Sequence, residues 1–134
     1  MKKLLLIIPI LLIITGCGEV KIKCNKNYDR NSESIIATTK NNKILKITME
    51  DIKVFDNNQE LDEEYNNSKT SLYLYKLING IKVDVSKNGN TIKEQVTIDL
   101  DKTGNNVIRK FLDLVEFTPS AFLEYAQNEG FTCN

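Results

Sequence analysis

Three cysteines carry the most distinctive chemistry in this 134-residue sequence: Cys17, Cys24 and Cys133. A cysteine thiolate can act as a nucleophile, accept a covalent lipid or form a disulfide. The sequence contains no histidine, which excludes Ser–His and Cys–His catalytic pairs and histidine-rich metal sites. The cysteines form no C-x-x-C pair, so a thioredoxin-like redox enzyme is also disfavoured.

Cys17 stands at the end of a segment with the composition of an export signal. Lys2 and Lys3 precede eleven residues, 4–14, none of which has a polar side chain. This run has the length of a signal-peptide core, whereas a membrane-spanning helix needs roughly 20 apolar residues. Residues 14–17 read Ile-Thr-Gly-Cys and resemble the bacterial lipobox, in which the cysteine receives the lipid.

The lipobox resemblance implies cleavage between Gly16 and Cys17 and a diacylglycerol thioether on Cys17, with palmitate or similar acyl chains. The implied partners are signal peptidase and the acyl-transfer machinery during maturation, and the lipid bilayer afterwards. We therefore expect a signal peptide at 1–16, a lipidated tether at 17–19 and one domain at 20–134, on the extracytoplasmic side of the cell membrane. The alternative is ordinary signal cleavage near Gly16, which leaves Cys17 as a free thiol.

The mature chain is close to neutral. The whole sequence has 18 basic and 18 acidic residues, and removal of Lys2 and Lys3 leaves 16 against 18, a net charge of −2. Binding to nucleic acid requires a clear excess of Lys and Arg, so we expect no nucleic-acid partner. This net charge does not attract an anionic lipid surface either, which predicts that the lipid alone holds the protein on the membrane.

Lipidation of Cys17 leaves Cys24 and Cys133 as an even pair in an exported chain, where oxidation can occur. The two cysteines lie at the two ends of the expected domain, and chain termini in compact domains often lie close together. We therefore predict a Cys24–Cys133 disulfide. By loop entropy, closing about 110 residues would stabilise the fold by roughly 4–5 kcal/mol. The alternative is two free, partly buried thiols.

The first half of the domain has the alternating apolar pattern of β-strands. Residues 19–24 alternate as in a half-buried strand, and the polar residues 25–32 are typical of a loop. Two further strands flank the pair 41–42, which predicts a hairpin. With that pair as the turn, Ile36 lies opposite Ile47 and both point to the apolar face.

A second hairpin is expected over residues 81–100, because the pair 88–89, Asn-Gly, is a strong turn signal. With this pair as the turn, Val85 lies opposite Ile92. Between the two hairpins, the apolar residues change from odd to even positions at 50–51. Such a change of phase predicts a bulge or a tight corner there.

Helical spacing of apolar residues appears three times. One predicted helix covers 61–77 and ends before Gly80, a second covers 107–115, and a third follows the N-cap pair Thr-Pro at 118–119 and ends at Gly130. The expected fold class is therefore α+β: an antiparallel sheet of about five strands with two to three helices packed on one face.

Two acidic stretches, 56–64 and 99–101, are the candidate cation sites. A calcium loop that starts at Asp56 lacks the glycine needed at its sixth position. A loop that starts at Asp99 has Lys110 where the ligating glutamate belongs. We therefore predict no metal site and no cofactor apart from the covalent lipid, and interpret the first stretch as the acidic first turn of a helix.

Three short motifs, in this order of elements, resemble the YehR-like family of small bacterial lipoproteins. The motifs are Gly80-Ile81 at the start of a strand, the V-T-I-D run at 96–99 followed by Leu-Asp-Lys, and Gly130-Phe131 near the C-terminus. The resemblance covers most of 20–131. It implies an α+β fold with helices on one face of an antiparallel sheet. The family has no established function, so the resemblance implies no catalytic residues.

The sequence favours a membrane-anchored extracytoplasmic domain that binds or interacts without catalysis, with a membrane or envelope protein as one candidate partner. One alternative is a carboxylate-based hydrolase that uses Asp99, Asp101 or the stretch 56–64, because paired carboxylates suffice for glycoside hydrolysis. Another is an accessory ligand-binding subunit of a transporter. Such subunits normally have two lobes, and 118 mature residues are few for two lobes.

Overall fold

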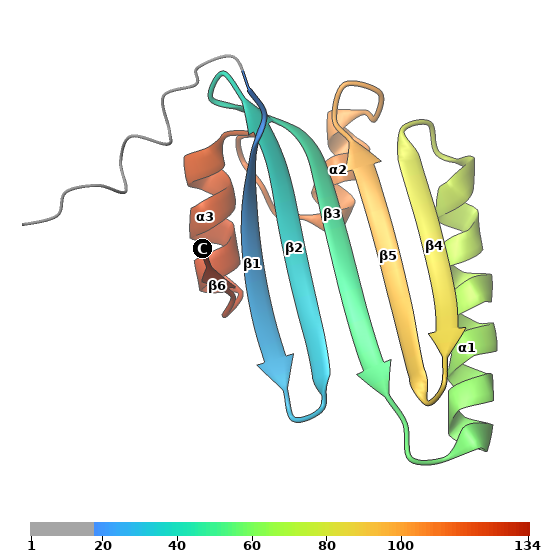
Figure 1. The fold of residues 1–134 in the computed structure, drawn as a ribbon. Coiled ribbons are helices and arrows are strands. Elements are labelled where there is room, and N and C mark those ends of the chain that lie inside the picture. Colours follow the sequence, from blue (N-terminus) through green and yellow to red (C-terminus); the bar gives the residue numbers. More distant parts are fainter. Residues whose placement is uncertain (1–17) are drawn as a thin grey trace, which may run out of the picture.

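The computed structural model describes residues 18–134, so Gly16, Cys17 and the export segment lie outside the described residues. The fold is an antiparallel sheet in the order β4-β5-β3-β2-β1-β6 (Figure 1). The strands are β1 (Val20–Tyr28), β2 (Asn31–Lys40), β3 (Lys43–Val54), β4 (Ile81–Asn88), β5 (Thr91–Asp99) and β6 (Thr132–Cys133). The predicted count of about five strands is wrong, because the two-residue β6 adds a sixth.

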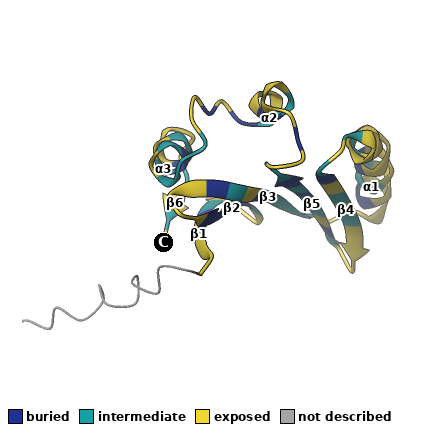
Figure 2. Cartoon of the chain, turned by 90° about the horizontal axis from the view of Figure 1, so that it is seen from above, coloured by how far each residue is buried: buried dark blue, intermediate teal, exposed yellow. Residues whose placement is uncertain are grey.

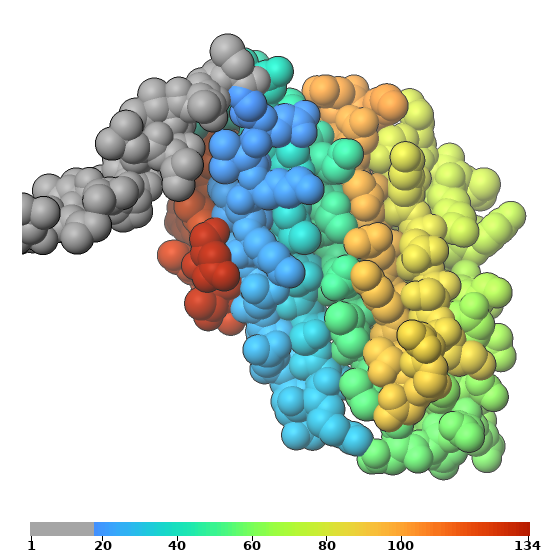
Figure 3. Space-filling view, in the orientation of Figure 1, coloured from blue at the N-terminus to red at the C-terminus, as the bar shows by residue number. Residues whose placement is uncertain are grey.

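The helices are α1 (Asn58–Tyr73), α2 (Asn105–Phe111) and α3 (Pro119–Asn128), with a short 3-10 helix, η2 (Leu74–Leu77), directly after α1. Seen along the sheet, all of them lie on one side of it (Figure 2). The other side is an open face, over which β1 to β5 form a continuous side-chain surface (Figure 3). One face of the sheet therefore holds the core and the other meets solvent.

Strand β1 is longer than predicted. The polar residues 25–32 are not a loop: they form the ends of β1 and β2, joined by a tight turn at Asp29 and Arg30. Asp29 has a positive φ of 48°, as tight hairpin turns require. The strands continue through polar sequence because their backbone pairing is independent of side-chain polarity.

The β2–β3 hairpin turns at residues 41–42 as predicted, and both asparagines have positive φ values of 52° and 61°. The predicted register is wrong: Ile47 lies opposite Ala37, and Ile36 lies opposite Thr48. A bulge beside Thr38 and Thr39 inserts one extra residue into β3 and shifts the pairing. The bulge therefore lies near the turn. The bulge or corner predicted at 50–51 is absent, because β3 runs unbroken through these residues.

The β4–β5 hairpin forms, but its turn is Gly89-Asn90, so Val85 lies opposite Glu94 rather than Ile92. Gly89 has φ +60° and occupies the first turn position, where a type II′ turn requires a glycine. The correction shifts the pairing of the two strands by two residues. Because side chains alternate with a period of two, the predicted inward face of both strands is unchanged.

Helix α3 begins where the sequence predicted it. The Thr118 side chain caps it by accepting a hydrogen bond from the Ala121 backbone N–H, and Pro119 is its first residue. The second predicted helix, 107–115, is too long: α2 ends at Phe111. The chain beyond α2 is irregular, and Val115, which the helical pattern placed inward, is 82% exposed.

The core consists of two clusters under the helices. The larger lies beneath α3 and includes Cys24, Ile35, Ala37, Ile44, Ile47, Leu112, Leu114, Phe122 and Ala126. The smaller lies near α2 and includes Ile81, Val96, Ile98 and Ile108. Met49, Phe111 and Phe117 pack against both clusters. The helices are therefore fixed at the two sides of the sheet, with α2 between them.

Gly80 fixes the entry into β4. It has φ +87°, and a Cβ there would overlap the Thr103 side-chain oxygen and lie 2.8 Å from the Lys102 Cβ. Thr103 is buried and donates a hydrogen bond to the Asn79 carbonyl over 3.1 Å. A glycine is therefore required by both its backbone conformation and this close approach.

Candidate functional site

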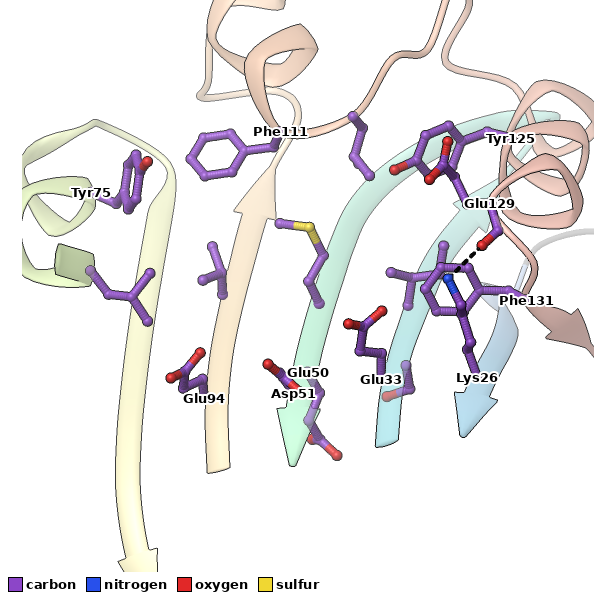
Figure 4. Close-up of a pocket in the computed structure, with 16 residues that line it drawn as sticks. Lys26, Glu33, Glu50, Asp51, Tyr75, Glu94, Phe111, Tyr125, Glu129 and Phe131 are labelled. Atoms are coloured by element: carbon purple, nitrogen blue, oxygen red, sulfur yellow. Dashed lines mark hydrogen bonds between the residues drawn. The ribbon is translucent and has the colours of Figure 1, made fainter. Parts of the chain in front are cut away.

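A groove runs across the helix-bearing face of the sheet, between α1 with η2 on one side and α3 on the other (Figure 4). Its volume is about 420 Å³. Its lining residues are Lys26, Glu33, Ser34, Ile35, Met49, Glu50, Asp51, Leu72, Tyr75, Glu94, Val96, Phe111, Leu112, Tyr125, Glu129 and Phe131. Every α-helix of the fold contributes at least one residue, so the groove depends on how the helices are placed.

One end of the groove is aromatic and apolar. Tyr75 and Phe111 meet edge to face, with ring centroids 4.9 Å apart. Tyr125 and Phe131 face them across the groove (Figure 4). The floor between the rings is the row Ile35, Met49 and Val96, which are paired on adjacent strands. This end can cover an apolar group of a ligand.

The other end is lined by acidic residues, of which Glu33, Asp51 and Glu94 form a row (Figure 4). Glu33 pairs with Asp51 between β2 and β3, and Asp51 pairs with Glu94 between β3 and β5. The three residues therefore form one row across adjacent strands, two residues along from the apolar row. Like charges on directly opposite positions repel each other, so this row requires compensation.

Lys53 supplies most of that compensation. Its ammonium nitrogen lies 2.7 Å from Glu64, 3.2 Å from Glu94 and 3.7 Å from Asp51. Burial lowers the pKa of Lys53, but the hydrogen bonds to Glu64 and Glu94 and the nearby negative charges outweigh it and raise that pKa overall. Lys53 therefore carries its charge throughout the physiological pH range.

The surroundings of Asp51 shift its pKa. Burial raises the pKa of Asp51 above its ordinary value, and the charge of Lys53 only partly offsets this. The negative charges of Glu94 and Glu33 raise it further. The ionised form of Asp51 is thus disfavoured in the folded protein, and an added positive charge in the groove would relieve it.

The remaining polar groups of the groove are held by hydrogen bonds. Ser68 of α1, which is buried, donates to Glu94, and the Tyr28 hydroxyl donates to Glu33 over 3.1 Å. The Lys26 ammonium donates to the Glu129 carbonyl over 2.8 Å. Across residues 18–134, every fully buried side-chain nitrogen or oxygen has such a partner. Hydrogen bonds therefore orient the carboxylates of Glu33 and Glu94 before any ligand arrives.

The predicted disulfide is confirmed. Cys24 in β1 and Cys133 in β6 are directly paired and joined through their sulfurs, at a sequence separation of 109. Phe131 packs against the larger core cluster, and its backbone N–H donates to the Ala126 carbonyl. The bridge therefore fixes the C-terminal segment that carries one wall of the groove.

The acidic stretch 56–64 forms a loop and the first turns of α1, where its side chains make separate ion pairs. Asp56 forms a bidentate pair with Arg30 at 2.6 Å, which lowers the pKa of Asp56, and Asp62 pairs with Lys87 at 2.6 Å. Within residues 18–134, no three His, Cys, Asp or Glu side chains group so that they could hold a metal ion.

The carboxylates Asp99 and Asp101, proposed for a hydrolase, do not reach the groove. Asp99 lies at the end of β5, opposite Lys46, and its carboxylate is 3.8 Å from the Lys102 ammonium. Asp101 is exposed in the loop that follows, and its backbone N–H donates to Asp99. The structure therefore uses this pair to form a turn.

Sequence reasoning missed all three groove carboxylates. Glu33 directly follows the predicted loop 25–32, Asp51 lies at a predicted bulge, and Glu94 lies within a predicted strand. The available signal was their position in the strand pattern. Glu33 lies two residues from Ile35, and Asp51 two residues from Met49, so each carboxylate shares the inward face with an apolar residue. A charged residue in phase with buried neighbours indicates either a paired charge or a binding site.

Comparison with known proteins and solved structures tests the fold expected from the sequence. No protein-family model matches the chain, and no curated protein is significantly similar to it. The NMR structure of E. coli YehR superimposes with a TM-score of 0.70 and 20% identity, over 88% of this chain and 92% of that chain. This chain has the fold of YehR.

A protein from Streptococcus pneumoniae TIGR4, also solved by NMR, shares the YehR fold at lower similarity. Its TM-score is 0.60 and its identity 11%, over 87% of this chain and 86% of that chain. At these identities the similarity extends to the fold alone. The YehR-like fold expected from the short sequence motifs is thus supported, and function has to be argued from the groove and the chain's own residues.

Proposed function

We propose that this protein is a lipid-anchored extracytoplasmic binding domain, and that the groove between α1 and α3 is its binding site. The single observation that carries the proposal is the groove itself, with about 420 Å³ of space, an aromatic end and an oriented carboxylate row. Small-molecule sites are typically concave, mostly apolar and equipped with a few fixed polar groups. The groove has each of these properties.

The anchoring part of the proposal rests on the sequence at 14–17 and on Cys17 as the lipid acceptor. One feature of the described chain supports it. A disulfide between Cys24 and Cys133 is typical of an oxidising compartment outside the cytoplasm. No helix in residues 18–134 is long and apolar enough to cross a membrane.

The ligand class follows from the two ends of the groove. Tyr75, Phe111 and Phe131 favour an apolar or aromatic body. The groove lining has one lysine, Lys26, and five acidic residues, and Lys53 pairs with only two of those acids, Asp51 and Glu94. A ligand with a cationic group attached to an apolar body therefore matches both ends at once, and a ligand with an anionic group is repelled.

A pair of matched probes tests this ligand class. We expect 4-phenylbutylamine to bind and to shift the amide NMR signals of Met49, Val96 and Phe111, whereas 4-phenylbutyrate, with the same body and the opposite charge, should not. Equal binding of the two probes, or shifts that map to the open face, would contradict the proposal. The measurement is a titration of the isotope-labelled protein.

Two variants separate charge from shape in this titration. Glu33→Gln together with Asp51→Asn should weaken amine binding about tenfold, which corresponds to about 1.4 kcal/mol of lost attraction. Phe111→Ala should weaken both probes by removing one aromatic wall. Glu60→Gln is the matched control, because Glu60 is an exposed acid in the first turn of α1 outside the groove lining.

The anchor is tested by intact mass. Protein extracted from its native membrane should have the mass of residues 17–134 plus a multi-acyl adduct, and Cys17→Ala should remain an unprocessed precursor without that adduct. A normally cleaved, unacylated wild-type protein would contradict the anchoring proposal. It would leave the groove proposal intact, because the two rest on different parts of the chain.

Hydrolysis by groove carboxylates is a second candidate, favoured by the raised pKa of Asp51 in a concave site. A carboxyl that stays protonated can act as a general acid beside an ionised partner such as Glu33 or Glu94. The test is turnover of a panel of aryl glycosides, with Asp51→Asn as the inactive variant. Turnover that survives this substitution would remove the candidate.

A further inference from the structure

One end of the sheet, the end at which β1 begins, differs in charge from the rest of the domain. We define the basic end as residues 18–23, 38–48, 76–82 and 97–104, which the strand pairing and the turns bring together (Figure 1). Four separate segments contribute to it, so the basic end does not exist as a run in the sequence.

The basic end has eight exposed lysines and three acidic residues, a net charge of +5. The lysines are Lys21, Lys23, Lys40, Lys43, Lys46, Lys76, Lys82 and Lys102, and the acidic residues are Glu19, Asp99 and Asp101. The rest of residues 18–134 has eight basic and fifteen acidic residues, a net charge of −7. The overall value of −2 therefore conceals two regions of opposite charge.

Exposed apolar side chains accompany the lysines at this end. Leu77 of η2 is 74% exposed and Val20 at the start of β1 is 55% exposed; Leu74, which lies just before the segment 76–82, is 66% exposed. Lys76 lies between the two leucines in the sequence. Lysines interspersed with exposed aliphatic residues are typical of surfaces that lie against a lipid headgroup layer.

The N-terminus of the domain emerges at the basic end. Strand β1 begins at Val20, so only Gly18 and Glu19 separate it from Cys17. An extended chain spans at most about 3.5 Å per residue, which limits this connection to roughly 10 Å. If Cys17 is lipidated, as proposed above, the basic end is the part of the domain closest to the bilayer.

We propose that the basic end is a membrane-docking surface that fits an anionic phospholipid layer. Docking orients the domain so that the strand ends at Lys40 and Lys43 meet the headgroups and the carboxylate end of the groove opens away from the membrane. The lysines act at short range, because charges are screened beyond about 10 Å at ordinary salt. The inference rests on the lipid anchor for proximity, and on the charge distribution for orientation.

Lysine footprinting on the lipidated protein tests this surface. The protein is reconstituted into vesicles of phosphatidylcholine alone or with 30% phosphatidylglycerol, acetylated briefly, and digested for mass spectrometry. We expect acetylation of Lys40, Lys43, Lys76 and Lys102 to fall about fivefold in the anionic vesicles. Lys87 and Lys93, which lie at or toward the opposite ends of β4 and β5, serve as internal controls and should not change.

Two further conditions test whether lysine charge causes the protection from acetylation. Added salt at 0.5 M should restore labelling at the basic end, because it screens the lysines from the lipid charge. Lys40→Glu together with Lys43→Glu should restore labelling of Lys76 and Lys102, whereas the matched Lys87→Glu should have no effect. Equal footprints in the two vesicle types, or protection spread evenly over the domain, would overturn the proposal.

The same experiment separates this inference from the anchor. If the purified protein has no acyl chain, the anchoring proposal fails, and the footprint is then recorded with anionic vesicles added in excess. Selective protection of the basic end under those conditions still supports a docking surface. Its absence overturns the surface independently of the anchor.

Discussion

The two sides of the sheet are held together by different means. On the α3 side, nine buried residues form the larger cluster, Phe122 is fully buried, and the disulfide joins β1 to β6. On the α1 side, the buried cluster has four residues and α1 itself buries only Leu61 and Ser68. Ion pairs from Lys53 to Glu64 and from Lys87 to Asp62 orient this helix instead.

This difference indicates which wall of the groove can adapt to a ligand. Apolar burial is non-directional and strong, whereas exposed ion pairs are individually weak and depend on salt. The α3 wall of the groove is therefore the fixed wall, and the α1 wall, with Tyr75 and the buried Ser68, is the adjustable one. A ligand that contacts both walls would add stability mainly to the α1 side.

Loss of the disulfide should have the largest effect on this contrast. Replacing Cys24 and Cys133 together by serine should lower the free energy of unfolding by about 4 kcal/mol, because it frees a long loop in the unfolded chain. Urea denaturation of the variant and of the wild type measures the change. A loss below about 1 kcal/mol would mean that the apolar cluster alone fixes the α3 side.

Truncation of one helix anchor on each side compares the two walls directly. Phe122→Ala should cost about 4 kcal/mol, since the ring is fully buried in the larger cluster. Leu61→Ala should cost about 2 kcal/mol, at the low end for a buried leucine, because α1 has few apolar neighbours. Equal costs in thermal or urea unfolding would show that the α1 side is as firmly packed as the α3 side.

Removal of one groove charge should have the smallest effect, and its sign is informative. Asp51→Asn should raise the free energy of unfolding at pH 7 by about 0.5 kcal/mol, because burial and neighbouring carboxylates disfavour the Asp51 anion. The raised pKa means that the wild type gains stability as the pH falls through that pKa. The gap between variant and wild type should therefore narrow as the pH falls from the raised pKa of Asp51 toward its ordinary value of 3.8, below which Asp51 is protonated in both states.

Asp62→Asn provides the matched control for this measurement. Asp62 pairs with Lys87 on the surface, so its loss should leave stability unchanged or slightly lower at pH 7. Thermal unfolding at pH 7 and at pH 4 distinguishes the two variants. If Asp51→Asn destabilises the protein at pH 7, the pair of Asp51 with Lys53 outweighs the desolvation of Asp51.

Local features of the fold could be read from the sequence because they depend on a few neighbouring residues. The asparagine turn at 41–42, the Thr118 cap before Pro119 and the Cys24–Cys133 pair were all predicted and are present. Each is determined by backbone preferences or by covalent chemistry. The lipobox at 14–17 is read in the same way, and it stays a prediction because it lies outside the described residues.

Other features were decided only by tertiary structure. The bulge beside Thr39, the sixth strand and the exposure of Val115 depend on what packs against those segments. The carboxylate row and the basic end are made from residues that are far apart in sequence and adjacent only after the strands pair. Net charge contains no information on such pairing. The local pattern predicts which strands form hairpins, but it does not predict the non-local pairing of β3 with β5.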